Sequence, residues 1–177
     1  MTVPGAVAQA TLVALLFSTA PAAAQAVRTD RASLRGLAGF EVVVEDLIPE
    51  APLDGLTGDQ LLDVVRDRLR AAGFPLTADP GGGAYLYINV NMTTGSGIYI
   101  YCVDVELRQA VRLERVPDQA VPEAVTWQTS VIGAVSAADL RAGITSVVVD
   151  QLDTFTREYA EENPGTVTVP SRAGPAM

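Results

Sequence analysis

The sequence predicts an α+β fold, with a four-stranded mixed or antiparallel sheet that carries two helices on one face. Alternating apolar and polar residues mark four segments, and apolar residues at three- and four-residue spacing mark two others. These segments follow one another as strand, helix, three strands, helix (β-α-β-β-β-α). Because both helices are expected on one face, the other face of the sheet is predicted to stay open.

The first strand is expected over residues 40–45, where apolar residues alternate, and Pro49 follows it. Thr57 and Gln60 then form a capping box that begins a helix ending at Gly73. The apolar side of this helix consists of Leu62, Val65, Leu69 and Ala72, and its charged side consists of Asp63, Arg66, Asp67 and Arg70. A right-handed crossover through this helix would make the first two strands parallel.

The next two strands are predicted to form a hairpin. Residues 85–92 alternate between polar and apolar, residues 93–97 resemble a turn, and a long strand follows over residues 98–113. In the long strand, Val103, Val105 and Leu107 are expected on one side and Cys102, Asp104, Glu106 and Arg108 on the other.

Residues 117–122, which begin and end with proline, are interpreted as a connection, and residues 125–132 as the fourth strand. This strand contains the single tryptophan, Trp127, and the pattern does not assign it to either face. Ser136 and Asp139 then predict the start of the second helix, which Asn163-Pro164-Gly165 ends. The helix carries one apolar stripe, made of Leu140, Ile144, Val147, Val148, Leu152, Phe155 and Tyr159.

The N-terminal residues have the pattern of a secretory signal. An uncharged apolar run, Ala6 to Phe17, leads into small residues that end in Ala24-Gln25-Ala26. We therefore expect a signal peptide over residues 1–26, a single domain over residues 27–164 and a flexible tail over residues 165–177. The protein is expected to be exported, periplasmic or extracellular, without a stable membrane anchor, because position 27 is not a cysteine.

The charge balance restricts the partners and the chemistry. Twelve basic residues against 21 acidic residues give a net charge of -9, which disfavours nucleic acid and anionic membranes. Histidine and lysine are absent, which excludes serine–histidine and cysteine–histidine catalysis, Schiff bases and histidine zinc sites. The protein is expected not to be an enzyme and to need no cofactor or metal. A small hydrolase that uses only carboxylates remains an alternative.

The candidate functional residues are apolar and aromatic side chains on the open sheet face, where the core does not need them. This predicted interface consists of Tyr85, Tyr87, Ile98, Ile100 and Cys102, which are expected to lie close together. Alternatively, the tail or the segment before the first strand covers this face. A register shift near Gly97 would instead turn Tyr99 and Tyr101 outward. A carrier of a small apolar ligand is a further alternative, and it requires a cavity lined by Leu86, Val105 and Phe155.

Several segments carry a resemblance to known proteins. The chain resembles a family of uncharacterised bacterial exported proteins in residues 37–44, in the helix 61–73 ending "LRAAGF", in "TWQTSVIGAV" and in "REYAEENPG". The order of strands and helices is also similar to the lipopolysaccharide-assembly lipoprotein and to the amino-terminal domain of the Tol translocation protein. This resemblance implies a non-catalytic binding or envelope-assembly accessory role, with a protein partner of unknown identity or a second copy of the chain.

Overall fold

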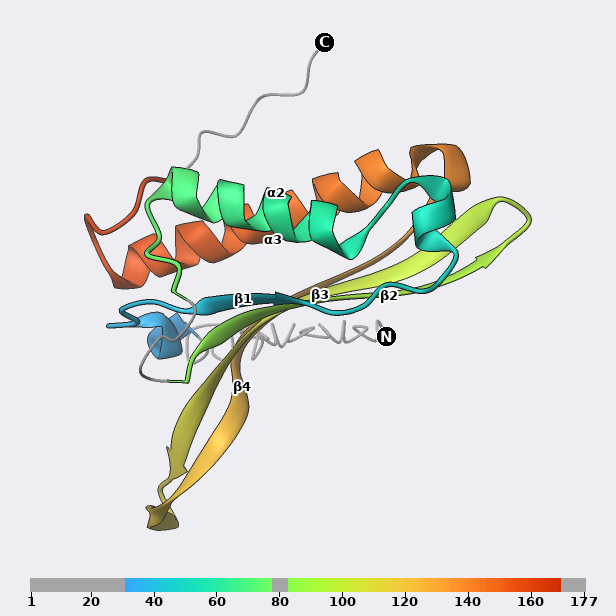
Figure 1. Cartoon of the computed structure of the whole chain (residues 1–177). Helices are drawn as coiled ribbons and strands as arrows, with labels where there is room; N and C mark the ends of the chain where they lie inside the picture. The colour runs from blue at the N-terminus through green and yellow to red at the C-terminus, as the bar shows by residue number, and fades with distance from the viewer. Residues whose placement is uncertain (1–30, 78–82, 170–177) are drawn as a thin grey trace, which may run out of the picture.

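The computed structural model describes residues 31–77 and 83–169, so the predicted signal peptide lies outside the described residues. The main elements are β1 (Glu41–Val44), α2 (Gly58–Ala72), β2 (Tyr85–Gly95), β3 (Ile98–Leu113), β4 (Val116–Ser136) and α3 (Leu140–Glu162) (Figure 1). Three short 3-10 helices accompany them, η1 (Ala32–Leu34), η2 (Ala51–Asp54) and η3 (Ala137–Asp139). The predicted order β-α-β-β-β-α is confirmed.

The four described strands form one mixed sheet in the order β1-β2-β3-β4. β1 pairs with β2 in parallel, as expected for a crossover through α2, whereas β2–β3 and β3–β4 are antiparallel. Figure 1 shows α2 and α3 side by side on the same face of this sheet. The predicted α+β class, with two helices on one face, is therefore confirmed.

Local sequence signals position both helices. Thr57 and Gln60 form the predicted capping box, and Gly73 ends α2 with a φ of 94°, in the left-handed region that glycine adopts readily. The buried residue in the first turns of α2 is Leu61, whereas Leu62 is half-buried, so the predicted stripe was displaced by one position there. Before α3, the Ser136 hydroxyl accepts a hydrogen bond from the backbone N–H of Asp139 at 3.2 Å.

The residues directly after α3 are attached to the body of the protein, contrary to the prediction of a flexible tail from residue 165. Val167 packs against the core, and the backbone N–H of Thr168 donates to the carbonyl of Ala72 at 2.8 Å. The apolar side chain and the free carbonyl at the end of α2 explain this attachment. Residues 170–177 lie outside the described part of the chain.

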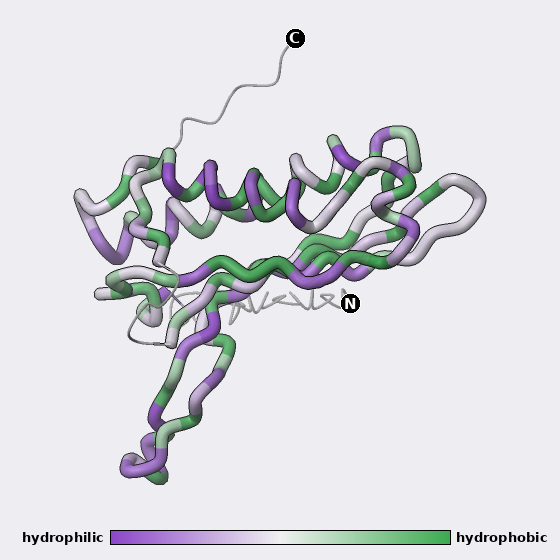
Figure 2. Tube along the Cα trace, in the orientation of Figure 1, coloured by the Kyte–Doolittle hydropathy of each residue, from purple (hydrophilic) through white to green (hydrophobic). Residues whose placement is uncertain are grey.

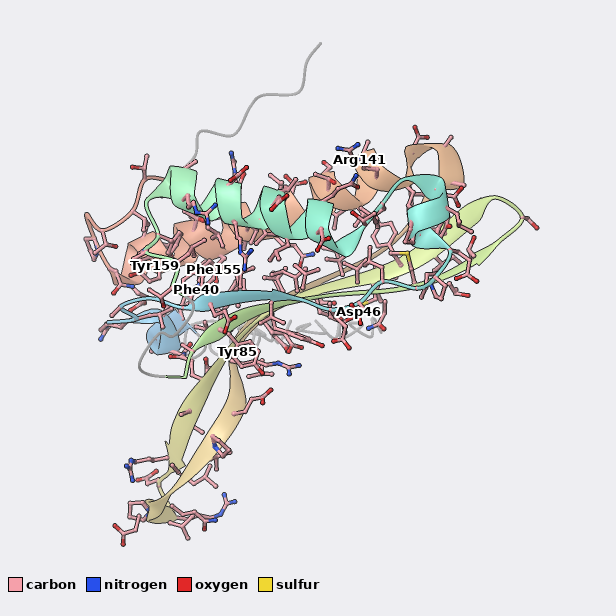
Figure 3. All side chains as sticks on the ribbon, viewed as in Figure 1. Phe40, Asp46, Tyr85, Arg141, Phe155 and Tyr159 are labelled. Atoms are coloured by element: carbon pink, nitrogen blue, oxygen red, sulfur yellow. The ribbon has the colours of Figure 1, made fainter. Side chains whose placement is uncertain are left out.

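Aromatic rings fill the space between the sheet and α3. Phe155 lies 5.6 Å from Phe40 and 5.1 Å from Trp127, measured between ring centroids. Figure 3 shows Phe40, Phe155 and Tyr159 gathered between the helix and the sheet. Trp127 therefore faces the helices, and its indole Nε1 donates to the Glu158 carboxylate at 2.8 Å.

Residues 109–124 of β3 and β4, which have no partner in β2, continue beyond the helices as a projecting two-stranded arm (Figure 1). Hydrophilic and hydrophobic positions intermingle in this arm (Figure 2). The interpretation of residues 117–122 as a connection is wrong, because β4 already begins at Val116. β4 is an outer strand of the sheet, and an outer strand tolerates Pro117 and Pro122 although they lack a backbone N–H.

Candidate binding surface on the outer face of the sheet

The side chains that face away from the helices form the outer face of the sheet. In the antiparallel register, Tyr85 and Tyr87 lie opposite Arg108 and Glu106, whereas Ile100 lies opposite Thr93. Ile100 and Glu106 are six positions apart in β3, which corresponds to about 20 Å along a strand. The prediction that the two tyrosines lie beside Ile98, Ile100 and Cys102 is therefore wrong, although all five residues share the outer face.

The reason for this separation is the tight turn between β2 and β3. β2 continues to Gly95, and only Ser96 and Gly97 connect it to β3. Both turn residues have a positive φ, 52° and 74°, as a two-residue hairpin turn requires. The first residues of β3 consequently pair with the last residues of β2, far from Tyr85.

The alternative register, in which Tyr99 and Tyr101 turn outward, does not occur. Both side chains are buried on the helix side of the sheet. The Tyr99 hydroxyl donates to the Asp54 carboxylate at 2.5 Å, and this hydrogen bond, followed by burial, raises the pKa of Tyr99 above its usual value. The outward positions on both sides of Tyr99 therefore belong to Ile98 and Ile100.

Exposed apolar side chains gather at the hairpin end of the outer face. Ile98, Ile100 and Ile132 remain 50%, 58% and 77% exposed. The register places Ile132 opposite Cys102, and Ala134 opposite Ile100. We call this set the apolar patch, and its members are Ile98, Ile100, Cys102, Ile132 and Ala134. The sequence interpretation missed Ile132 and Ala134, although alternation within "TWQTSVIGAV" would have placed them outward once Trp127 was known to face inward.

Cys102 links the apolar patch to a polar middle section of the face. The free thiol is half-buried, and its Sγ lies 3.6 Å from an Asp104 carboxylate oxygen and 3.5 Å from the Ser130 hydroxyl. Ser130 in turn donates to Asp104 at 2.6 Å. These hydrogen bonds satisfy the polar groups next to the patch within the chain itself.

At the other end of the face, Tyr85 and Tyr87 belong to a network of charged and aromatic groups. The Arg108 guanidinium lies 4.0 Å above the ring of Tyr87, as in a cation–π contact. Arg108 donates to Glu106 and to Glu123, each at 2.8 Å, and the Tyr85 hydroxyl also donates to Glu123. We call these five residues the tyrosine–arginine cluster. Figure 3 shows Tyr85 on the side of the sheet away from the helices.

The tyrosine–arginine cluster has the electrostatics of a structural contact. Hydrogen bonds from Tyr85 and then Arg108 lower the pKa of Glu123 below its usual value. Burial, followed by the hydrogen bond to Glu123, raises the pKa of Tyr85. A general acid requires a carboxyl pKa that is raised instead of lowered. Because Glu123 lies in the arm, the cluster connects the base of the arm to β2.

The described segments that precede β1 and follow α3 in the chain lie away from the apolar patch. Arg31, next to η1, forms an ion pair with Glu158 of α3 at 2.9 Å, and the Ser33 hydroxyl donates to the Thr126 carbonyl at 2.7 Å. At the other end of the chain, Thr168 bonds to Ala72 of α2. Within residues 31–77 and 83–169, neither segment covers Ile98, Ile100 or Ile132.

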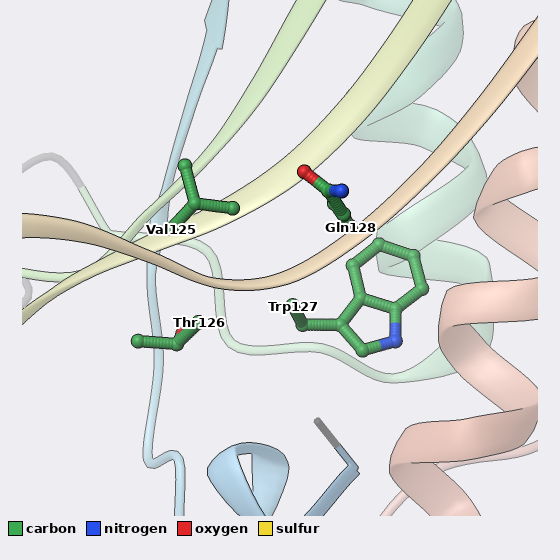
Figure 4. Close-up of a pocket in the computed structure, with 4 residues that line it drawn as sticks. All are labelled: Val125, Thr126, Trp127 and Gln128. Atoms are coloured by element: carbon green, nitrogen blue, oxygen red, sulfur yellow. The ribbon is translucent and has the colours of Figure 1, made fainter. Parts of the chain in front are cut away.

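A small pocket of about 220 Å³ lies beside β4, lined by Val125, Thr126, Trp127 and Gln128 (Figure 4). It coincides with a register shift, because Leu107 pairs with Trp127 and Arg108 with Val125, so that Thr126 is the extra residue of β4 at this point. The Thr126 hydroxyl instead donates to the Leu107 carbonyl at 3.2 Å. A second pocket of about 190 Å³ lies between β1 and α2 and includes Glu41, Arg66 and Arg70.

The described residues contain no group of three or more acidic, cysteine or histidine side chains that could hold a metal ion. In the same part of the chain, no helix has the length and apolar character needed to cross a membrane. Comparison with family models, curated proteins and solved structures finds no match for this chain. The resemblance to uncharacterised exported proteins therefore stays a prediction.

Proposed function

We propose that the protein is an exported, non-catalytic binding or envelope-assembly accessory protein, whose contact surface is the outer face of the sheet. The observation that carries this proposal is the exposure of three isoleucines, Ile98, Ile100 and Ile132, side by side in the apolar patch. Complete burial of a large aliphatic side chain contributes roughly 1.5 to 3 kcal/mol. Three such residues, each at least half exposed, would contribute on the order of 3 to 6 kcal/mol to a complex before its entropic costs.

The contact is centred on the apolar patch and not on the two tyrosines. Tyr85 and Tyr87 already have partners within the chain, through Glu123 and Arg108. The isoleucines have no comparable use in the core, because Tyr99, Tyr101 and Val103 fill the helix side of the same strand. Apolar side chains grouped on a surface are typical of an interface.

Two alternative functions have less support from the structure. A carboxylate-dependent hydrolase needs a carboxyl with a raised pKa, and the pKa of Glu123 in its charged network shifts downward. A carrier of an apolar ligand needs a cavity beside Phe155, and that ring is surrounded by aromatic neighbours at centroid distances of 5.1 to 6.2 Å. Leu86 and Val105 are fully buried in the same core.

The test is photo-crosslinking in cells, with the photoreactive residue at Thr93, which is exposed and opposite Ile100. A matched probe at Asp67, on the exposed side of α2, serves as the control. We expect a discrete adduct from position 93 alone, and its loss when Ile98→Asp and Ile100→Asp are combined. Leu53→Asp, which alters an exposed leucine outside the patch, should leave the adduct intact.

The outcome depends on stability as well as on the adduct. If the Ile98→Asp, Ile100→Asp variant unfolds, the isoleucines belong to the core and the proposal fails. An adduct that persists in the folded double variant would also contradict it. The exported state is tested separately, because N-terminal sequencing of the secreted protein should begin at Val27.

A further inference from the structure

One side of β4 is a free strand edge. Among the described strands, β4 pairs with β3 and has no neighbour on its other side. The N–H of Ala137 donates to the carbonyl of Gly97 at 2.9 Å, so Ala137 and every second residue before it direct their backbone groups toward β3. Since hydrogen-bonded and non-hydrogen-bonded pairs alternate, every second residue of β4 directs its N–H and C=O toward the free edge. These residues are Gln128, Ser130, Ile132, Ala134 and Ser136, all of them exposed.

This stretch lacks the devices that usually protect an edge strand. In the arm, Pro117, Pro122 and several register shifts disfavour pairing with another strand, and at Thr126 the carbonyl accepts the Ser33 hydroxyl. Residues 128–136 contain no proline, no charged side chain and no register shift. The edge is therefore protected up to Thr126 and open beyond it.

The distribution of charged residues along the chain indicates which partner binds to the open edge of β4. The chain carries a net charge of -9, yet residues 124–136 are uncharged. Two copies that approach through this stretch place no like charges opposite each other, whereas most other surfaces of the chain would repel their own copy. The open edge thus fits a second copy of this chain.

We infer that two copies pair antiparallel along β4, about a two-fold axis at Ile132. This register places Ile132 opposite the partner's Ile132, Ser130 opposite the partner's Ala134 and Gln128 opposite the partner's Ser136. The carbonyl of Ser136 already accepts in the first turn of η3, so the register forms about eight hydrogen bonds between the copies. An axis at Ala134 would extend into η3 and form fewer bonds. An axis at Ser130 would reach the occupied carbonyl of Thr126, and it would place the exposed Ile132 opposite Gln128 instead of a second isoleucine.

The pairing produces one continuous eight-stranded sheet. Ile132, the most exposed of the three isoleucines in the apolar patch, meets its own copy on the outer face. The two patches consequently become a single surface that crosses the two-fold axis. The inference does not depend on the proposed function, because it concerns the backbone edge of β4 and not the occupant of the outer face.

Disulfide trapping tests the register, in a Cys102→Ser background that removes the natural thiol. Directly opposed residues in a hydrogen-bonded antiparallel pair have Cα atoms about 5.5 Å apart, which a disulfide can bridge. Ile132→Cys should therefore give a covalent dimer under mild oxidation. Gln128→Cys should not, because in this register about 27 Å separates residue 128 from its own copy. A mixture of the Gln128→Cys and Ser136→Cys variants should cross-link.

Sedimentation analysis tests the association itself. We expect twice the monomer mass for the wild type and the monomer mass for Ala134→Pro, since proline removes an edge-directed N–H and no bond to β3. Ala134→Ser keeps the N–H and should remain a dimer. If Ala134→Pro does not fold, Ile132→Lys replaces it, because it opposes two like charges on the axis. The combined Ile98→Asp and Ile100→Asp variant, which tests the proposed function, should leave the dimer intact.

A wild type that stays monomeric at about 100 μM, where a dimer of micromolar affinity would form, overturns the inference. A dimer that survives both Ala134→Pro and Ile132→Lys also overturns it. If Gln128→Cys and Ile132→Cys each form a covalent dimer equally well, the two β4 strands pair in parallel, and the antiparallel register is overturned.

Discussion

Gly133 occupies a position in β4 where the structure leaves no room for a side chain. It lies opposite Tyr101, whose ring crosses the glycine on the helix side of the sheet. A Cβ atom at position 133 would lie 2.4 Å from the Tyr101 hydroxyl oxygen and 2.6 Å from Cζ. Gly133→Ala therefore cannot be accommodated unless the tyrosine ring moves.

The magnitude follows from this geometry. The ring must retreat by about 1 Å to restore an ordinary contact of 3.4 Å, and overpacking of this kind typically costs about 1 to 3 kcal/mol. Replacing glycine with alanine also restricts the unfolded chain, which returns about 0.4 to 1 kcal/mol. We expect Gly133→Ala to lower the free energy of unfolding by roughly 1 to 2 kcal/mol.

Urea denaturation at a fixed protein concentration measures this loss. The matched control is Gly95→Ala in β2, where a Cβ atom meets nothing within 4 Å and φ is not positive. This control should be neutral or slightly stabilising. Combining Gly133→Ala with Tyr101→Leu should cost less than the sum of the two single changes, because the shortened side chain removes the clash.

Equal stabilities of Gly133→Ala and Gly95→Ala would refute the reasoning. Strict additivity in the double variant would refute it as well, since it would show that the ring of Tyr101 does not restrict position 133.

Three further predictions concern polar contacts. Trp127→Phe removes the hydrogen bond to the Glu158 carboxylate, and should lower the free energy of unfolding in urea by about 1.5 to 3 kcal/mol; no loss would contradict a structural role. Asp153→Asn breaks the partly exposed ion pair between Asp153 and Arg68, in which the two charged groups lie 2.6 Å apart. The free energy of unfolding should fall by less than about 1 kcal/mol, and the loss should be smaller in 0.5 M salt. The pKa of Glu123 is lowered, so its stabilising effect is complete above its usual pKa and disappears as the pH falls through the lowered value. The stabilities of Glu123→Gln and the wild type should therefore converge at low pH, and a constant difference would exclude this linkage.

Local patterns in the sequence were sufficient to predict the fold class. The bounds of β3 match the predicted strand over residues 98–113, because a long alternating segment has one consistent assignment of faces. The Thr57 side chain satisfies a free N–H group at the start of α2, and the Ser136 side chain does the same at the start of η3, which leads directly into α3. These features depend on neighbours within a few residues, which a sequence displays directly.

The arrangement of the candidate surface could not be predicted in the same way, because it depends on strand register. Alternation placed Tyr87 and Ile100 on the same face, but the distance between them depends on which residues form the turn between β2 and β3. The inward orientation of Trp127 follows from the uninterrupted ladder that pairs Ile98 with Ser136 and Leu107 with Trp127, and the sequence alone does not reveal that register. Ile132 was missed for the same reason, since its neighbours across the sheet are known only once β4 is aligned with β3.

The chemistry of the proposed surfaces leads to one more expectation, on the effect of salt. The apolar patch and the edge of β4 meet at Ile132, and residues 124–136 are uncharged in a chain with a net charge of -9. Association through these surfaces gains little from attraction between charges, whereas the repulsion between two acidic copies opposes it. Raising the salt concentration from 0.1 M to 1 M shortens the screening length from about 10 Å to about 3 Å, which weakens that repulsion.

We therefore expect self-association, measured by sedimentation, to stay constant or to strengthen with salt. Sodium chloride also tends to favour burial of apolar surface, so a variant with additional negative charge away from the edge separates the two effects. Ala71→Glu, at an exposed position of α2, which packs against β1 at the opposite edge of the sheet, should show a steeper increase of affinity with salt than the wild type. Dissociation of the wild-type dimer in 1 M salt would mean that ion pairs hold it together, and would place the interface on the charged surfaces and not along β4.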